Sequence, residues 1–105
     1  MRQHTNKMTL LTILLTLVSA AQAQTPAAGQ KLATTCAACH GEKGISNNDL
    51  WPNLAGQKKD YIVKQLTAFQ NGDRKDPMMS PMAGTLSSED IQNVAAYFSS
   101  LKTNP

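Results

Sequence analysis

The fold of this chain is decided by one short stretch, Cys36-Ala37-Ala38-Cys39-His40. It contains both cysteines of the 105-residue chain and one of its two histidines. Residues three apart are neighbours on one face of a helix, so the two thiols would lie one turn apart. The histidine that follows is turned toward the same side. The two thiols and the imidazole are therefore placed to hold one bound group.

This C-x-x-C-H pattern is typical of the attachment sequence of a c-type haem. Cys36 and Cys39 can reach the two vinyl groups of one porphyrin, and His40 can place a nitrogen on its iron. Two other kinds of site compete with this interpretation. A dithiol redox pair usually lies in a β-α-β context and needs no following histidine. A structural zinc site needs four ligands, whereas residues 24–105 contain only three cysteines and histidines. The pattern therefore predicts one covalent haem c, with its iron bound by His40.

The segment before this stretch predicts export. Arg2 and Lys7 form a basic region before an apolar run of eleven residues, 8–18, and Ala21-Gln22-Ala23 follows. A basic region, a short apolar region and a small-residue cleavage site together make a secretory signal peptide. The run is too short to span a bilayer comfortably. We therefore expect residues 1–23 to be cleaved, and residues 24–105 to form a single domain in the periplasm.

The composition of that domain narrows its function. Removing residues 1–23 leaves 82 residues with a net charge of +1. A nucleic-acid-binding domain would carry a basic patch or stripe, and none is visible here. A domain of this size has a marginal core and often needs a disulfide, a metal or another staple. We expect no nucleic-acid partner and no membrane span in residues 24–105, and a haem that completes the core.

The periodicity predicts an all-α fold with three main helices. Residues 28–39 are mostly helix formers that end before Gly41, and residues 58–71 repeat apolar side chains at helical spacing before Gly72. A capping box, Ser87-Ser88-Glu89-Asp90, predicts the start of a third helix. Its inward stripe is Ile91, Val94, Ala95, Phe98 and Leu101. Residues 41–57 and 73–86 are rich in turn formers and prolines, and we expect both to be loops.

The second axial position of the iron needs a donor other than histidine, because His40 is the only histidine after residue 23. Three methionines, Met78, Met79 and Met82, lie within five positions of the proline-containing segment 76–82. A methionine is more often a soft core filler. Three in so short a segment instead favour thioether ligation, since His/Met is a known haem ligand pair.

These residues resemble the small class I c-type cytochromes of bacterial periplasms, both short single-haem members and each half of the diheme proteins. The resemblance covers residues 27–101. It is carried by four motifs in the family's order, Cys36–Gly41, Trp51–Gln57, Met79–Ala83 and Leu86–Ile91, the last followed by residues 95–98. It implies the small cytochrome c fold, with helices and ordered loops wrapped around one covalent haem.

The resemblance also implies roles for single residues. The carbonyl of Pro52 should accept a hydrogen bond from His40 Nδ1, which orients the imidazole and raises its basicity. Leu54 should pack on the ring edge. Met79 matches the family's iron ligand, and Met82 is the next candidate.

The resemblance implies helix packing too. The first and last helices should cross, with small residues Gly29 and Ala33 facing the bulky Tyr97 or Phe98.

A haem with two protein ligands has no room for a substrate, which favours one-electron exchange over catalysis. The sequence therefore predicts a monomeric, non-enzymatic electron carrier of the periplasm, bound transiently by reductase and oxidase partners. Two alternatives stay open. The chain could be the haem c subunit of a larger periplasmic dehydrogenase or oxidase complex. It could also be a haem enzyme or gas sensor with an open axial position, if the methionine segment does not coordinate.

Overall fold

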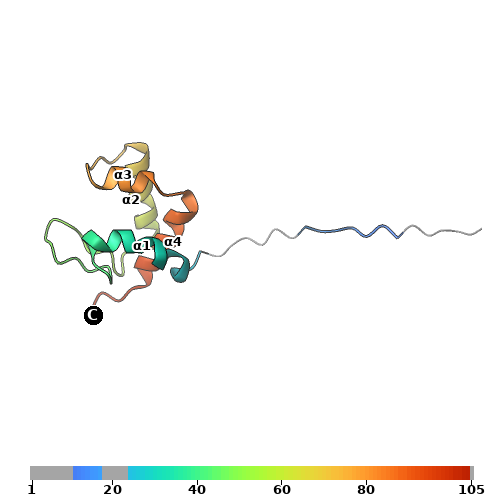
Figure 1. Cartoon of the computed structure of the whole chain (residues 1–105), viewed down its shortest axis with the longest axis horizontal. Helices are drawn as coiled ribbons and strands as arrows, with labels where there is room; N and C mark the ends of the chain where they lie inside the picture. The colour runs from blue at the N-terminus through green and yellow to red at the C-terminus, as the bar shows by residue number, and fades with distance from the viewer. Residues whose placement is uncertain (1–10, 18–23, 105) are drawn as a thin grey trace, which may run out of the picture.

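The computed structural model describes residues 11–17 and 24–104. Four helices follow one another along the chain (Figure 1): α1 (Pro26–His40), α2 (Lys59–Asn71), α3 (Met79–Gly84) and α4 (Ser88–Ser100). Within these described ranges there is no strand. The all-α class and the cytochrome-like order of helices and loops are thereby confirmed.

Residues 11–17 belong to the apolar part of the expected signal peptide, and they are exposed and form neither helix nor strand. Arg2, Lys7 and the cleavage site at Ala23 lie outside the described residues, so the signal peptide stays a prediction. Within the described ranges, no helix is both long and apolar enough to cross a membrane.

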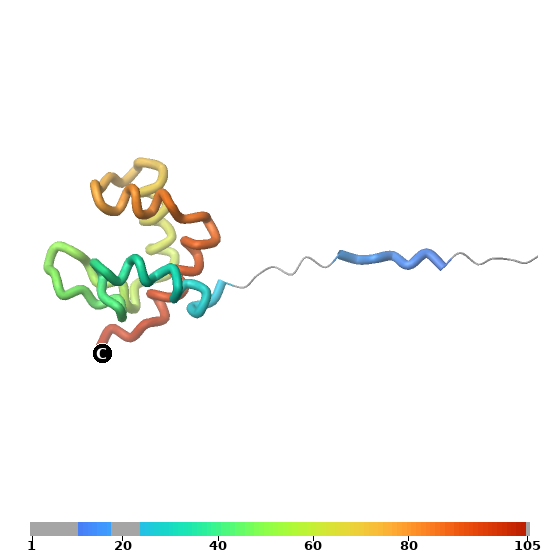
Figure 2. The backbone as a smooth tube through the Cα atoms, in the orientation of Figure 1, coloured from blue at the N-terminus to red at the C-terminus, as the bar shows by residue number. Residues whose placement is uncertain are grey.

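Helices α1 and α4 cross at a close approach (Figure 2). Gly29 of α1 is buried, and a Cβ built there would overlap the carbonyl oxygen of Asn93 and lie 2.8 Å from Cβ of Tyr97. Ala33, one turn further along, is 3% exposed. The predicted small-residue face on α1 is therefore confirmed, and Tyr97 is the bulky neighbour of Gly29.

The hydrophobic core lies between α4 and the inner faces of the other helices. The predicted stripe of α4 is confirmed at Ile91, Val94, Ala95 and Phe98, which are all buried, while Leu101 is half-buried where the helix ends. Helix α2 contributes Ile62, Leu66 and Phe69. Phe98 is 0% exposed and is the largest fully buried side chain.

The helix ends agree with the local signals in the sequence. The Ser87 hydroxyl accepts a hydrogen bond from Asp90 N at 3.0 Å, and the Asp90 carboxylate accepts one from Ser87 N at 2.9 Å. This is the predicted capping box. Gly72 ends α2 in the left-handed conformation with φ of 83°, which glycine adopts without a steric penalty.

One element differs from the prediction. Residues 73–86 were expected to form a loop, but they contain the short helix α3, so the fold has one helix more than the three predicted main helices. Pro81 is the third residue of α3, where a backbone amide has no partner within the helix. A proline loses no hydrogen bond in the first turn, so Pro81 does not exclude a helix there.

Candidate functional site

The end of α1 carries the first part of the candidate site. Cys36, Cys39 and His40 all lie in its last turns, and the two cysteines are free thiols that are partly buried. Burial raises the pKa of the Cys36 thiol, and the neighbouring Cys39 adds a smaller effect in the same direction. The two thiols are not consumed by a disulfide, and both remain available for covalent attachment.

His40 is buried and has a defined orientation. Its side chain is 7% exposed, and Nδ1 lies 2.8 Å from the carbonyl oxygen of Pro52. A carbonyl oxygen can only accept a hydrogen bond, so Nδ1 carries the proton and donates it. In the neutral imidazole this leaves the lone pair on Nε2, which is the tautomer that a metal-ligating histidine requires. The hydrogen bond expected between these two residues is present.

The loop between α1 and α2 folds back so that the carbonyl oxygen of Pro52 lies beside the His40 imidazole. The Gly44 carbonyl oxygen accepts hydrogen bonds from Leu54 N at 2.8 Å and from Ala55 N at 2.9 Å. Gly44 has φ of +71° and a Cβ there would lie 2.8 Å from Ala55 N. The position therefore requires glycine on both conformational and spatial grounds. Leu54 is partly buried and packs against the hydrophobic core.

The three methionines occupy different environments. Met79 is partly buried and packs against the hydrophobic core, whereas Met78 is 59% exposed and Met82 is 39% exposed. Ala83, which is four residues after Met79 and shares its helix face, is 1% exposed. Met79 is therefore the most buried of the three methionines. Met82, three residues later, neighbours it on the helix surface but is more exposed, and Met78 is the most exposed.

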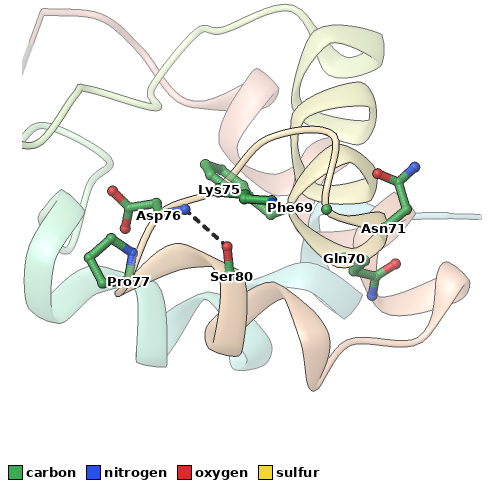
Figure 3. A pocket seen from close by; sticks show the side chains of 8 residues that line it. Phe69, Gln70, Asn71, Lys75, Asp76, Pro77 and Ser80 are labelled. Carbon is green, nitrogen blue, oxygen red and sulfur yellow. Dashed lines mark hydrogen bonds between the residues drawn. The ribbon is translucent and has the colours of Figure 1, made fainter.

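The methionine segment is held at its beginning by contacts that the sequence analysis missed. Asp76 Oδ1 accepts hydrogen bonds from Met78 N and Met79 N, both at 2.8 Å. The Ser80 hydroxyl accepts a hydrogen bond from Asp76 N at 3.0 Å (Figure 3). The two amide donors, that of Met79 first, lower the pKa of the Asp76 carboxyl. An aspartate followed by Pro77 is a known signal for a helix start, and it could have identified this turn.

A second contact, from α2, holds the other end of α3. Gln70 Nε2 donates hydrogen bonds to the carbonyl oxygens of Ala83 at 2.8 Å and Leu86 at 2.7 Å. No local sequence signal predicts these bonds, because they join α2 to residues 13 and 16 positions further along the chain. Gln70 thereby ties the last turn of α2 to the end of the methionine segment.

A shallow depression of about 550 Å³ lies over the turn between α2 and α3 (Figure 3). Residues between Phe69 and Ser80 line it, and they include neither cysteine nor His40. Arg74, on the same turn, stacks over the Phe69 ring at 4.5 Å and donates to Gln65 Oε1 at 2.7 Å. The depression is therefore a separate surface feature and not the place where the thiols and the imidazole act.

The donor set fits a covalently attached haem. Cys36 and Cys39 lie three residues apart in one helix, and neither is bonded to the other. His40 donates from Nδ1 to a carbonyl oxygen, which leaves Nε2 of the neutral ring as the ligating nitrogen. Met79, in a separate segment, packs against the core and carries the thioether that the resemblance implies as the second iron ligand. These are the groups that attach and ligate a c-type haem.

Comparison with known proteins finds similarity over most of the chain. Residues 26–102 match the family described as Cytochrome c. Cytochrome c-554(548) of Halomonas halodenitrificans is 44% identical over 77 residues, which are 70% of this chain and 93% of that protein. Cytochrome c4 of Thiocapsa roseopersicina is 41% identical over 88 residues, which are 83% of this chain but 45% of that protein.

Two longer proteins extend this picture. The "thiosulfate dehydrogenase electron acceptor" of Thiomonas intermedia is 40% identical over 77 residues, covering 72% of this chain and 36% of that protein. The solved structure of Acidithiobacillus ferrooxidans cytochrome c4 superimposes with a TM-score of 0.70 at 34% identity. That match covers 79% of this chain and 53% of the cytochrome c4 chain. The chain thus spans about half, or less, of several relatives that it matches.

Proposed function

The chain belongs to the cytochrome c family, and on this premise we propose that it carries single electrons in the periplasm, with iron bound between His40 and Met79. The cofactor of the family is haem c, which supplies an iron that exchanges one electron between its ferrous and ferric states. The observation that carries the proposal is the hydrogen bond from His40 Nδ1 to Pro52. It leaves Nε2 of the neutral ring as an oriented, buried nitrogen that can bind iron.

Each residue at the end of α1 has one task in this proposal. Cys36 and Cys39 form the two thioether bonds, and their spacing of one helical turn suits two groups on the same ring. His40 provides the first axial nitrogen, and Pro52 holds that imidazole in one tautomer and raises its basicity. Leu54, in the loop that carries Pro52, packs against the core. In this proposal it excludes water from the edge of the haem ring.

Met79 provides the second axial donor. The support is its burial, since it packs against the core while Met78 and Met82 are 59% and 39% exposed. A thioether opposite a histidine, in an apolar surrounding, favours the ferrous state and raises the reduction potential. Iron held by both His40 and Met79 would leave no place for a substrate, and the chain would then transfer electrons without catalysing a reaction of its own.

The same proposal covers processing and partners. Residues 1–23 are removed as a signal peptide, and residues 24–105 act as a monomer with a net charge of +1. So small a charge gives little long-range steering. Reductase and oxidase partners therefore bind weakly and transiently, through a small contact area.

The ligand pair is tested by the near-infrared absorption of the ferric protein. Methionine sulfur bound to ferric iron gives a weak band in this region. We expect the band in the wild-type protein, its loss in Met79→Ala, and its retention in Met82→Ala, which is the matched control. A band that survives Met79→Ala would assign the ligand to another sulfur. Rapid carbon monoxide binding by the ferrous wild-type protein would instead favour an enzyme or sensor with an open position.

A second candidate function is that of a haem subunit serving a dehydrogenase. It is favoured by the similarity to the electron acceptor of a thiosulfate dehydrogenase, although that protein is much longer. Size-exclusion chromatography of the purified chain with a purified thiosulfate dehydrogenase separates the two functions. Stable co-elution would favour the subunit. Reduction by thiosulfate through the dehydrogenase without co-elution would favour the free carrier.

A further inference from the structure

We propose that Gln70 and Asp76 are positioning residues that select Met79, among the three methionines of the α3 segment, as the iron ligand. The inference rests on the proposed His40/Met79 ligation. It assigns a role to two side chains that themselves touch neither the thiols nor the imidazole.

Selection is needed because the three methionines are chemically equivalent donors. Met78, Met79 and Met82 carry the same thioether within five positions of the chain. At about 100° per residue, Met78 lies about 100° and Met82 about 60° around the helix axis from Met79, so a partial turn of the segment would present a different sulfur. Thioether chemistry cannot distinguish them, and the orientation of the segment must.

The α3 segment cannot set this orientation alone. It is a helix of six residues, and isolated helices shorter than about 12–15 residues are marginal in water. Its own apolar anchors on the core are few, chiefly Met79 and Ala83. Contacts from outside the helix must therefore fix its rotation and its distance from the core.

Asp76 fixes the beginning of the segment. A single oxygen, Oδ1, accepts hydrogen bonds from Met78 N and Met79 N, so the backbone of the proposed ligand itself is bound to this carboxylate. The Ser80 hydroxyl accepts a hydrogen bond from Asp76 N and closes the turn. These bonds all lie within residues 76–80, so they fix the backbone turn from which the helix starts and the place of Met79 within it. The orientation of that turn toward the core comes from contacts with other elements.

Gln70 fixes the end of the segment against α2. Both hydrogens of its amide group are used, one toward Ala83 O and one toward Leu86 O. Helix α2 is anchored in the core by Leu66 and Phe69, so Gln70 transmits the position of a stable helix to a short one. With the segment held against α2, Met79 is the methionine that packs against the core, and Met78 and Met82 are more exposed.

The first test removes the two N–H donors of the Gln70 side chain while keeping its size and shape. Gln70→Glu places a carboxylate without hydrogens against two carbonyl oxygens. Gln65→Glu is the matched control, because Gln65 lies on the same helix and its Oε1 accepts a hydrogen bond from Arg74 instead. For Gln70→Glu we expect a weakened near-infrared band and carbon monoxide binding to the ferrous protein that is about thirtyfold faster, as for two lost hydrogen bonds. We expect the control to match the wild-type protein.

The second test uses Asp76. Asp76→Ala removes the acceptor and should give the same spectral change, whereas Asp76→Asn keeps an amide oxygen at the place of Oδ1 and should restore the wild-type band. Each variant is also made in a Met82→Ala chain, so that the Met82 sulfur cannot replace that of Met79 unnoticed. If Gln70→Glu does not fold, the Asp76 pair decides the inference by itself.

The failures are distinguishable. If the wild-type protein lacks the methionine band, or if Met79→Ala retains it, the proposed ligation is wrong and this inference fails with it. If Met79→Ala abolishes the band but Gln70→Glu and Asp76→Ala keep the wild-type spectrum and carbon monoxide rate, the two residues only stabilise the fold. The inference is then overturned while the proposed function stands.

Discussion

Replacing Gly29 by alanine should destabilise the domain, although alanine is the better helix former. Gly29 lies in α1 where this helix crosses α4. The added Cβ would lie 2.5 Å from the carbonyl carbon of Asn93 and 2.8 Å from Cβ of Tyr97. The obstacle is chiefly backbone, which cannot rotate away as the end of a flexible side chain can. The two helices must therefore move apart.

The magnitude follows from two opposing terms. Alanine gains about 1 kcal/mol over glycine in a helix interior. Overpacking of a close contact costs about 1–3 kcal/mol and occasionally more, and a backbone obstacle places Gly29→Ala at the upper end of that range. The net loss is then about 2 kcal/mol. For a domain of this size, that corresponds to a decrease in Tm of about 8–16 °C.

The assay is thermal unfolding of the haem-loaded protein, followed by circular dichroism. Gly84→Ala is the matched control, because Gly84 is also helical but has no atom within 4 Å of an added Cβ. We expect Gly84→Ala to equal or slightly exceed the wild-type Tm. A Gly29→Ala protein as stable as the wild type would refute the close crossing of α1 and α4.

Three further substitutions test other parts of the fold by denaturant unfolding. Ser87→Ala removes the hydroxyl that accepts a hydrogen bond from Asp90 N and should cost about 1 kcal/mol; an unchanged midpoint would contradict the capping box. Phe98→Ala empties a fully buried position and should cost about 3–5 kcal/mol; a loss below 1 kcal/mol would mean that the core lies elsewhere. Gly44→Ala imposes a Cβ at φ +71°, 2.8 Å from Ala55 N, and should cost about 1–3 kcal/mol; wild-type stability would show that the loop carrying Pro52 is not folded as described.

The helices that the sequence predicted well are those with local signals. Helix α4 begins at a capping box and carries a regular apolar stripe, and both signals act within a few residues of the chain. Helix α1 contains the C-x-x-C-H motif, whose spacing already requires a helical turn. Such features depend on neighbouring residues alone, so they can be recognised without knowledge of the tertiary structure.

Helix α3 was missed because its prolines were weighed without their positions. Pro77 and Pro81 resist a helix interior, but Pro77 precedes α3, next to Asp76, whose carboxylate accepts hydrogen bonds from Met78 N and Met79 N. Pro81 lies in the first turn of α3. In those places the missing amide hydrogen has no cost within the helix. The short length of α3 also left too little periodicity to detect.

Contacts between segments distant in the sequence could not be predicted from local signals. The bond from His40 to Pro52 was expected from the family resemblance and not from the spacing, because nothing local relates two residues separated by a loop. The bonds of Gln70 to Ala83 and Leu86 were not expected at all. Each depends on how the helices pack, and a single glutamine on an exposed helix face carries no signal of its partner.

The central claim, that this domain closes around one covalently tethered haem, is tested most directly by the intact mass of the exported protein. The protein would be purified from a bacterial host that attaches c-type haem and then treated with acidified organic solvent, which removes non-covalent haem. We expect one species with the mass of residues 24–105 plus a single haem, and colour that stays with the polypeptide. A mass without the haem increment, or a colourless polypeptide after extraction, would contradict the account.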